Sequence, residues 1–453
     1  MKTKRSSRLF AAATALAAAS VPFSALAACP PEAGDCQQLL ENGSLGARID
    51  LVILGDGYTE AEKDKFYGDA QAAVAGMLDS EMYSSYKPVF NAYALFTPSA
   101  QSGADNPSEG LSVDTAFDAS YDTNGIFYLL AVNYAKVLKE LNDRFPEKDM
   151  AVVLVNDTEY GGSGGQVAVF SLDSNSVEIG RHELGHTFAN LADEYTAPYP
   201  GFPDGDPEPN VATADHLDPV KWEMWLTPGV AVPTPDSAAN ADHDPIGAFE
   251  GARYKETGVF RPAPNCIMRE LNVAFCPVCA EAMVKSFSEL SLLIDAPVPA
   301  SPAAIPAEGA TPFTATIPAL SNLTFTWTVD GQMVPEAGPV LALDPSALGL
   351  ADGPHKVDLT VYDATPLVRN DPTGVMKETF TWDVAVDSSL PPIGGSGGAG
   401  GGGGGGGTGG GGSGGSGDGP CGCRAAGETS GTPAGWLLLG LAPFVARLRR
   451  RRS

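Results

Sequence analysis

Short apolar runs alternate with segments of helical periodicity along the first part of the chain. Three runs are almost entirely apolar, as in strands buried on both faces of a sheet; they are 49–54, 89–96 and 150–155. The segment 59–62, Thr-Glu-Ala-Glu, has the pattern of a capping box and predicts a helix that continues to about Leu78. The amphipathic segment 125–145 predicts a second helix. Strands that alternate with helices predict an α/β domain with a largely parallel sheet.

A further helix is predicted after the third apolar run, and its two faces differ in character. Four apolar residues fall on one side of its helical wheel: Val177, Leu184, Phe188 and Leu191. His182 and His186 fall on the opposite side. Asn175 or Ser176 can cap the first turn, and Glu178 follows Asn175 at the spacing of a capping box. A buried active-site helix must pack one face against the core and present its functional side chains on another face. This helix has both faces.

The histidine face carries the motif His-Glu-x-x-His. Side chains four residues apart lie about one turn apart on a helix, so His182 and His186 can bind one Zn²⁺. Glu183 follows the first histidine and can take a proton from a water molecule that the metal activates. Two surface histidines on an ordinary helix are the alternative. The chain contains only 5 histidines, however, so this pairing would rarely arise by chance.

A catalytic zinc site needs a third protein ligand and one open position. We expect Asp193 to be the third ligand. Competing candidates are Glu194, His216 and His243. In a straight helix Asp193 would lie about 10 Å beyond His186, too far to share a metal. The helix must therefore end before Asp193 and the chain must turn back, and Asn190 suits this turn because asparagine tolerates the left-handed conformation.

The segment from His182 to Tyr195 resembles the His-Glu-x-Gly-His…Ala-Asp-Glu-Tyr signature of the M64 metallopeptidases, the IgA-peptidase family. Four other blocks also resemble that family: Leu54–Thr59, Tyr160–Gly165, Phe249–Tyr254 and Phe260–Arg269. The resemblance implies a zincin-like α/β catalytic domain at 29–296, with a mixed, largely parallel sheet, an active-site helix, Zn²⁺ as cofactor and peptide-bond hydrolysis as the reaction. The chain departs from the family at Ala189 and Asn190, where the family usually has glycine.

Further residues are candidates for roles around this site. The glycines of 161–165 precede an apolar strand at 167–170, and they predict either a flexible hairpin or an edge strand above the cleft. A peptide substrate could add to such an edge through main-chain hydrogen bonds. Tyr254 and Tyr195 are candidates to donate a hydrogen bond to the oxyanion of the tetrahedral intermediate. Met268 is either an ordinary core methionine or, by resemblance to the metzincins, a side chain that packs beneath the metal.

The 7 cysteines fall into three groups, the last of them in the tail at 421–453. Cys29 and Cys36 are expected to form a disulfide, although the four residues ending at Cys29 also resemble a bacterial lipobox that would place a lipid there. The Cys-x-x-Cys pair of Cys276 and Cys279 could be half of a zinc site. No fourth ligand near Cys266 can be identified from the sequence. A disulfide from Cys266 to Cys276 or Cys279 is therefore expected in an exported chain.

Beyond residue 297 the hydrophobic pattern changes to period two. Three segments alternate apolar and polar residues between turns rich in Gly, Pro and Asp; they are 323–329, 357–361 and 380–386. This pattern predicts a small all-β immunoglobulin-like sandwich at 297–388. It contains no catalytic constellation and is expected to act as a spacer or a substrate-docking domain. A flexible linker rich in Gly and Ser is expected at 389–420.

Both ends of the chain have features of an exported, tethered protein. Residues 1–28 have the basic start, short apolar core and small residues of a secretory signal peptide. In the segment 421–453, an apolar stretch shorter than the roughly 20 residues of a comfortable membrane span precedes an arginine cluster. This arrangement resembles the MYXO-CTERM sorting tail, and the resemblance implies processing and lipid attachment at Cys421. A plain C-terminal anchor is the alternative.

These patterns predict an exported zinc metalloendopeptidase that is tethered at the cell surface, is monomeric and acts on extracellular proteins or peptides. The formal net charge of -27 argues against nucleic acids and anionic membranes as partners, so membrane contact is expected only through the tail. Two other functions are open: a zinc-dependent amidase acting on cell-wall or glycan-linked amides, and a non-catalytic surface adhesin. The presence of Glu183 favours catalysis, because a purely structural metal site would not need it.

Overall fold

The computed structural model describes residues 29–199, 201–335 and 338–393. The expected signal peptide at 1–28, most of the expected linker at 389–420 and the expected tail at 421–453 lie outside these residues. Within them, no helix is both long enough and apolar enough to cross a membrane.

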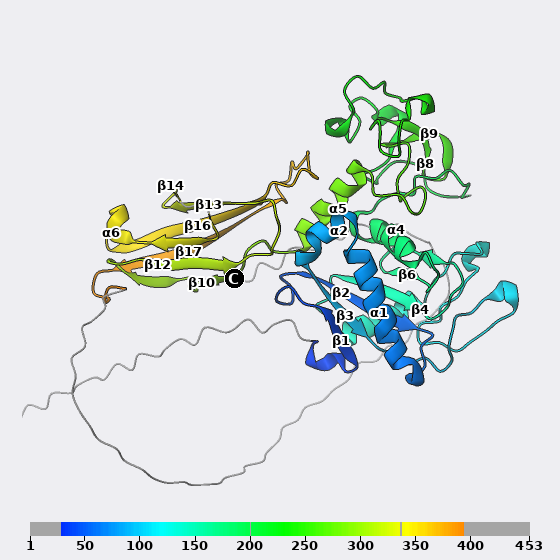
Figure 1. Ribbon diagram of the computed structural model, residues 1–453, viewed down its shortest axis with the longest axis horizontal. Helices are drawn as coiled ribbons and strands as arrows, with labels where there is room; N and C mark the ends of the chain where they lie inside the picture. Colours follow the sequence, from blue (N-terminus) through cyan, green and yellow to red (C-terminus); the bar gives the residue numbers. More distant parts are fainter. Residues whose placement is uncertain (1–28, 200, 336–337, 394–453) are drawn as a thin grey trace, which may run out of the picture.

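A six-stranded mixed sheet forms the centre of the first domain (Figure 1). Its strands are β1 (Cys36–Leu40), β2 (Ile49–Asp56), β3 (Phe90–Leu95), β4 (Met150–Val155), β5 (Gly162–Ser163) and β6 (Ala168–Phe170), in the order β1-β3-β2-β4-β6-β5. The four inner strands are parallel, and the edge strands β1 and β5 are antiparallel to their neighbours. The apolar runs thus form the buried strands that their composition predicts. Cys29 and Cys36 form the expected disulfide at the start of β1.

Helices cover both faces of the sheet. Four helices lie on one face, where they pack against inward side chains of β2 such as Leu51; they are α1 (Lys63–Leu78), α2 (Glu81–Tyr86), α4 (Ser176–Ala189) and α5 (Pro277–Leu290). The opposite face of β2, which includes Val52, packs against α3 (Tyr134–Arg144). Successive side chains of a strand point to opposite faces of the sheet, so β2 contributes residues to the hydrophobic core on each face. The expected capping box is present, with Thr59 N donating to Glu62 at 2.9 Å just before α1.

The expected helix at 125–145 was wrong in its first half. Helix α3 begins only at Tyr134, with the Asn133 side chain accepting a hydrogen bond from Lys136 N at its first turn. Gly125, where the expected helix would begin, has a positive φ angle of 75°, which a right-handed helix cannot accommodate. The residues before α3 instead form backbone bridges that connect Leu129 to Gly162 and Ala131 to Ser120. The bridge to Gly162 holds this segment beside the edge strand β5.

A long loop region and a small sheet follow α4. The sheet consists of β7 (Ala212–Thr213), β9 (Lys255–Arg261) and β8 (Phe249–Ala252), in that order. It lies in the upper right part of Figure 1, beyond the ends of α4 and α5. Short 3-10 turns occur in the first domain at Pro31–Ala33, Glu60–Glu62, Lys87–Val89, Pro107–Glu109, Thr123–Gly125, Ala214–His216, Glu223–Trp225 and Asp236–Ala238.

The second domain is a sandwich of two β-sheets. One sheet has the order β10 (Asp295–Val298), β12 (Thr311–Thr316), β15 (Val340–Leu343), and the other has β11 (Ala303–Pro306), β17 (Lys377–Asp387), β16 (Gly353–Asp363), β13 (Leu323–Val329), β14 (Gln332–Val334). A short helix, α6 (Pro345–Leu348), follows β15. The two sheets enclose a core in which Trp327 and Trp382 stack with ring centroids 5.6 Å apart. The three segments that alternate apolar and polar residues thus form strands, as predicted, and all three belong to the larger sheet, in β13, β16 and β17.

The loop between β16 and β17 connects the sandwich to the first domain. Tyr86, in α2, donates a hydrogen bond to Asp363 at 2.7 Å, and both side chains are buried. The guanidinium of Arg369 lies 3.9 Å from the ring centroid of Trp225. The sandwich therefore packs against the helical side of the first domain through specific polar and aromatic contacts.

Candidate metal centre

Helix α4 carries both histidines of the motif on one face. Leu184 and Phe188 point into the core, and the histidine side chains lie on the opposite face, as the helical wheel predicts. The predicted capping box is wrong, because Asn175 makes no side-chain cap bond and Glu178 pairs with Arg181 at 2.8 Å. The start of the helix is nevertheless the expected one.

The chain reverses direction immediately after the helix. Asn190 has φ 49° and ψ 42°, the left-handed conformation expected at this position. Its N–H donates to His186 O at 3.0 Å, and Leu191 N donates to Gly185 O at 3.2 Å. The turn brings the next residues back alongside the histidine face. Asparagine adopts this conformation more readily than most residues, so Asn190 can end the helix here.

His182, His186 and Asp193 converge on one point. Their ligand atoms all lie within 4.8 Å of one another. His182 Nε2 is 3.0 Å from Asp193 Oδ1, His186 Nε2 is 3.4 Å from the same oxygen, and the two Nε2 atoms are 3.2 Å apart. The structure thus brings together the three metal ligands expected from the sequence.

The other nitrogen of each imidazole is fixed by a backbone carbonyl. His182 Nδ1 lies 2.9 Å from Ile267 O, and His186 Nδ1 lies 2.6 Å from Leu191 O. A carbonyl can only accept, so each Nδ1 carries a proton, and Nε2 is the nitrogen of each ring that faces the common point and can bind a metal ion once it is deprotonated. Two imidazole lone pairs and a carboxylate oxygen that face each other fit a divalent cation such as Zn²⁺. The sequence offers no signal for Ile267 or Leu191, because any residue supplies a carbonyl.

Asp193 is buried and held from two sides. Burial acts to raise the pKa of its carboxyl, but the adjacent imidazoles outweigh burial and hold that pKa well below its usual range. Its second oxygen, Oδ2, accepts a hydrogen bond from the Tyr254 hydroxyl. The carboxylate therefore stays ionised and oriented with Oδ1 toward the histidines.

Glu183 lies within the same buried region, with 9% of its surface exposed. Burial raises the pKa of its carboxyl, against the opposing effect of the neighbouring imidazoles. A carboxylate whose pKa is raised toward neutrality is better suited to accept and return a proton. Its carboxylate faces the glycine segment: a Cβ added to Gly164 would lie 2.7 Å from Glu183 Oε2 and 3.0 Å from the His186 ring. Only a residue without a side chain fits there.

The glycine segment contains β5, an edge strand that forms an antiparallel hairpin with β6, so it combines the hairpin and the edge strand considered from the sequence. Strand β5 pairs with β6 at the edge of the sheet. Gly162 is already paired on its outer side, donating to Tyr128 O and accepting from Leu130 N, both at 3.3 Å. Within the described part of the chain, by contrast, the N–H groups of residues 164–166 make no hydrogen bond. The unpaired part of this edge therefore begins beside Glu183.

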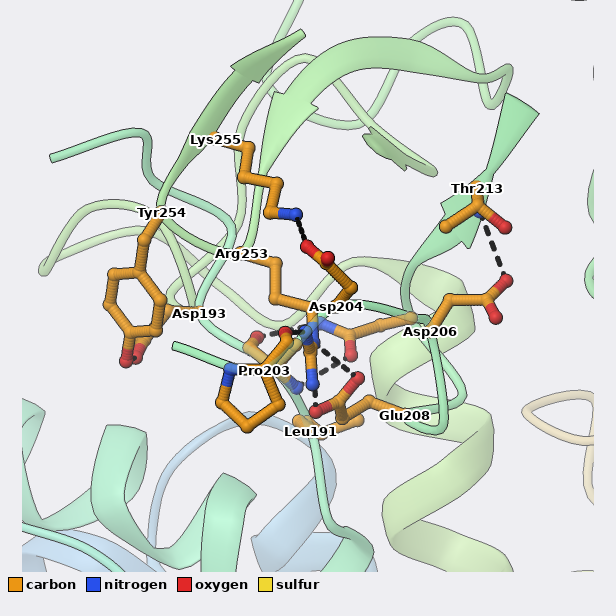
Figure 2. Close-up of polar contacts among 12 residues, drawn as sticks. Leu191, Asp193, Pro203, Asp204, Asp206, Glu208, Thr213, Arg253, Tyr254 and Lys255 are labelled. Atoms are coloured by element: carbon orange, nitrogen blue, oxygen red, sulfur yellow. Dashed lines mark hydrogen bonds and ion pairs between the residues drawn. The ribbon is translucent and has the colours of Figure 1, made fainter. Parts of the chain in front are cut away.

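A tight hairpin positions Tyr254 (Figure 2). Arg253 and Tyr254 connect β8 to β9 with φ angles of 54° and 63°, a two-residue turn that usually contains Asn and Gly. Their N–H groups donate to Asp193 O at 2.8 Å and to Tyr195 O at 3.0 Å. Figure 2 shows the two side chains diverging, with Tyr254 beside Asp193 and Arg253 directed to Glu208. The backbone bonds and the buried Arg253–Glu208 ion pair at 2.9 Å hold this unfavourable turn.

Tyr195, the other tyrosine singled out from the sequence, is partly buried and packs edge-on against Tyr254. Their ring centroids are 5.4 Å apart. Tyr195 therefore borders the candidate metal centre through its contact with Tyr254.

The competing third-ligand candidates lie elsewhere. His216 is exposed and pairs with Asp206 at 2.9 Å, and His243 lies 3.0 Å from Ala274 O. The side chain of Glu194 points away from the histidines and joins Cys266, Cys276 and Cys279. All three cysteines are free thiols, so the expected disulfide from Cys266 to Cys276 or Cys279 was wrong.

Met268 is fully buried directly behind the histidine face. A Cβ added to Gly185, which lies between the two histidines in α4, would be 2.7 Å from Met268 Sδ. The thioether therefore packs against α4 within the hydrophobic core, a position that fits both of the placements considered from the sequence.

The α/β sheet, the helix and the convergent His-His-Asp set together describe a metal-dependent hydrolase of the His-Glu-x-x-His class. Comparison with known families agrees: residues 37–245 and 238–287 match the family described as IgA Peptidase M64. The two matches cover more than half of the chain, which therefore belongs to this family of metallopeptidases. No curated protein matches the chain.

Proposed function

We propose that this chain is a zinc metalloendopeptidase in which His182, His186 and Asp193 hold the metal. The observation that carries the proposal is the convergence of two Nε2 atoms and one carboxylate oxygen within 4.8 Å, beside a buried glutamate. A Zn²⁺ ion bound there would supply Lewis acidity to a water molecule and to the carbonyl of the scissile peptide. The remaining chemistry belongs to side chains and backbone groups of the chain.

Glu183 acts as the general base and then as the general acid. Its carboxylate accepts a proton from the attacking water molecule and passes that proton to the leaving amine. Burial favours this double role, because it brings the pKa of Glu183 closer to neutrality. An adhesin with a purely structural metal would gain nothing from a buried carboxylate at this position.

The substrate adds as a strand beside the glycine segment. Among the residues that the structure describes, the N–H groups of 164–166 find no partner, and the first of these residues adjoins Glu183 and His186. An extended peptide that pairs with these groups would pass in front of the metal ligands with its backbone aligned. Recognition through the main chain requires no particular side chain, so we expect broad tolerance of sequence near the cleaved bond.

Tyr254 and Tyr195 remain the candidates for oxyanion stabilisation, and the contact of Tyr254 with Asp193 adds a second candidate role, the orientation of that ligand. We further propose that the sandwich is immunoglobulin-like and serves as a spacer or docking domain. The zincin-like fold assignment, export, surface tethering and the monomeric state are likewise proposals that rest on the sequence.

Glu183→Gln tests the mechanism. The variant keeps the size of the side chain and removes the proton acceptor, so it should retain its metal while hydrolysis of a fluorogenic peptide falls about 10²–10⁴-fold. The test is to measure metal content by mass spectrometry and kcat/KM on the same preparation. Full activity in a metal-loaded Glu183→Gln protein would refute the role of Glu183.

A further inference from the structure

A second cluster of ligating side chains lies behind the candidate metal centre. The Sγ atoms of Cys266, Cys276 and Cys279 and a carboxylate oxygen of Glu194 all lie within 4.8 Å of one another. All four residues are completely buried. They come from three segments: the loop that follows the turn after α4, the segment before α5, and the first turn of α5 itself.

Hydrogen bonds within the protein do not satisfy this cluster. Glu194 Oε1 accepts from Asn210 Nδ2 at 2.9 Å and from Cys279 Sγ at 3.3 Å. The other oxygen, Oε2, is buried and has no hydrogen-bond partner in the described part of the chain. A fully buried carboxylate oxygen with no donor is costly and calls for a ligand that the protein atoms do not provide.

The donors have the number, type and spacing of a closed zinc site. A tetrahedral site with Zn–S bonds of about 2.3 Å places its ligand atoms about 3.8 Å apart, which is compatible with four atoms that lie within 4.8 Å of one another. Three sulfur ligands and one carboxylate leave no open position, as in structural rather than catalytic zinc sites.

Burial raises the pKa of the Cys266 and Cys279 thiols, so a bound cation would have to stabilise their thiolates; nearby positive groups offset part of this cost. Cys276 is the N-cap of α5 and Cys279 lies in its first turn, where the positive end of the helix dipole stabilises thiolates. Cys276 N donates to Cys266 Sγ at 3.3 Å. The guanidinium of Arg261, itself buried, acts electrostatically on Glu194 from nearby. Three thiolates and a carboxylate carry more negative charge than one divalent ion neutralises. The helix start, the backbone N–H and the guanidinium offset part of the remainder.

We propose that Cys266, Cys276, Cys279 and Glu194 bind a second, structural Zn²⁺ that holds together the scaffold of the first centre. Each zinc–thiolate bond forms as the thiol loses its proton to solvent, so no oxidant is needed. A disulfide between two of these cysteines would leave the third thiol and Glu194 Oε2 without partners. The set of four donors therefore fits the ion better than it fits a disulfide.

The consequence for the first centre follows from chain connectivity. Glu194 follows Asp193 directly, and Glu194 N donates to Met268 O at 2.7 Å. Cys266 precedes Ile267, whose carbonyl fixes His182 Nδ1. An ion bound at the cysteines would thus fix both a ligand of the catalytic metal and a carbonyl that orients another ligand.

Metal stoichiometry of the full chain tests the proposal independently of activity. The wild-type protein, purified without a metal-affinity step, should contain two zinc ions per chain by native mass spectrometry, and the His182→Ala/His186→Ala variant should keep one. Cobalt exchanged into that histidine variant should show thiolate-to-cobalt charge-transfer absorption, and Cys276→Ser should abolish it. If Cys276→Ser does not fold, the histidine variant alone still provides the cobalt spectrum and the zinc count.

Alkylation of the denatured, unreduced protein after chelation completes the test. Two results together support the site: alkylation modifies all three thiols, and the folded histidine variant retains one zinc ion before chelation. A disulfide among these cysteines, or loss of all bound metal in the histidine variant, overturns it. If the wild type contains one zinc ion that the histidine variant retains with thiolate character, the second site stands and the proposed catalytic centre fails.

Discussion

The Tyr254 hydroxyl donates a hydrogen bond to Asp193 Oδ2, while Oδ1 of the same carboxylate lies 3.0 Å from His182 Nε2. The two oxygens of one side chain thus connect a tyrosine of the β8–β9 hairpin to the histidine face of α4. In this arrangement the phenol orients a metal ligand. To stabilise an oxyanion, it would have to release Asp193 during the reaction.

Tyr254→Phe separates these two roles. If the hydroxyl orients Asp193, its loss should weaken metal affinity about 10–100-fold, as is usual for partners of metal ligands. If it stabilises the oxyanion, metal affinity should be unchanged and kcat should fall about 10²–10³-fold. Titration against a competing chelator, alongside steady-state kinetics, distinguishes the two outcomes. We expect the affinity to fall, and Tyr195→Phe, which leaves the contact of Tyr254 with Asp193 intact, to retain near wild-type affinity.

Gly164→Ala should lower kcat/KM by at least about tenfold while the protein stays folded. The new Cβ would lie 2.7 Å from Glu183 Oε2, and the carboxylate can swing away from it only by leaving its position beside the histidines. A displacement of about 1 Å in a catalytic group can cost about 10²-fold in rate. Peptide hydrolysis and circular dichroism provide the measurement.

Gly68→Ala is the matched control for that variant. Gly68 is exposed in the middle of α1, and no atom lies within 4 Å of an added Cβ. Alanine there should leave activity unchanged and stabilise the helix by about 0.5–1 kcal/mol. Equal activity of the Gly164 and Gly68 variants would contradict the close placement of Glu183 against the glycine segment.

Breaking the buried pair between Arg253 and Glu208 should destabilise the protein by about 3–5 kcal/mol, because the remaining charge stays buried without a partner. Arg253→Met should therefore lower the urea midpoint markedly. The control is Lys255→Ala, two residues away, which removes the exposed ion pair with Asp204 and should cost at most about 1 kcal/mol. If Arg253→Met and Lys255→Ala lowered the free energy of unfolding by similar amounts, the buried pair would not support the hairpin.

Local patterns in the sequence were sufficient for much of this architecture. Buried strands, the histidine helix and the sandwich follow from hydrophobic period, and the turn at Asn190 follows from the requirement that Asp193 return to the histidines. Contacts between distant backbone atoms could not be predicted, because the carbonyls of Leu191 and Ile267 carry no residue-specific signal. The helix expected from 125 failed because its first residues pair with the edge strand β5 instead.

The cysteine cluster shows a different limit. Spacing alone suggests half a metal site or a disulfide, and the fourth donor, Glu194, is more than 70 residues away in sequence. Glu194 competed with Asp193 for one role in the sequence analysis. In the folded chain the two neighbouring carboxylates face different clusters, so both can act as ligands.

Asp363, at the interface between the domains, carries a pH-dependent prediction. Burial raises the pKa of its carboxyl, although the Tyr86 hydroxyl and Thr365 N donate hydrogen bonds to it. A pKa that is higher in the folded than in the unfolded protein means that the folded protein binds the proton more tightly. The stability of the wild type should therefore decrease as pH rises from about 4 through the raised pKa.

Asp363→Asn removes this dependence and keeps the contacts. Its amide oxygen can accept from Thr365 N, and its amide nitrogen can donate to the Tyr86 hydroxyl, which accepts as well as donates. The variant should be more stable than the wild type at pH 8, by about 1.4 kcal/mol for each unit by which the pKa is raised, and the difference should disappear near pH 4. Urea unfolding at the two pH values measures it, and a difference that is the same at both would mean that the buried carboxyl has an ordinary pKa.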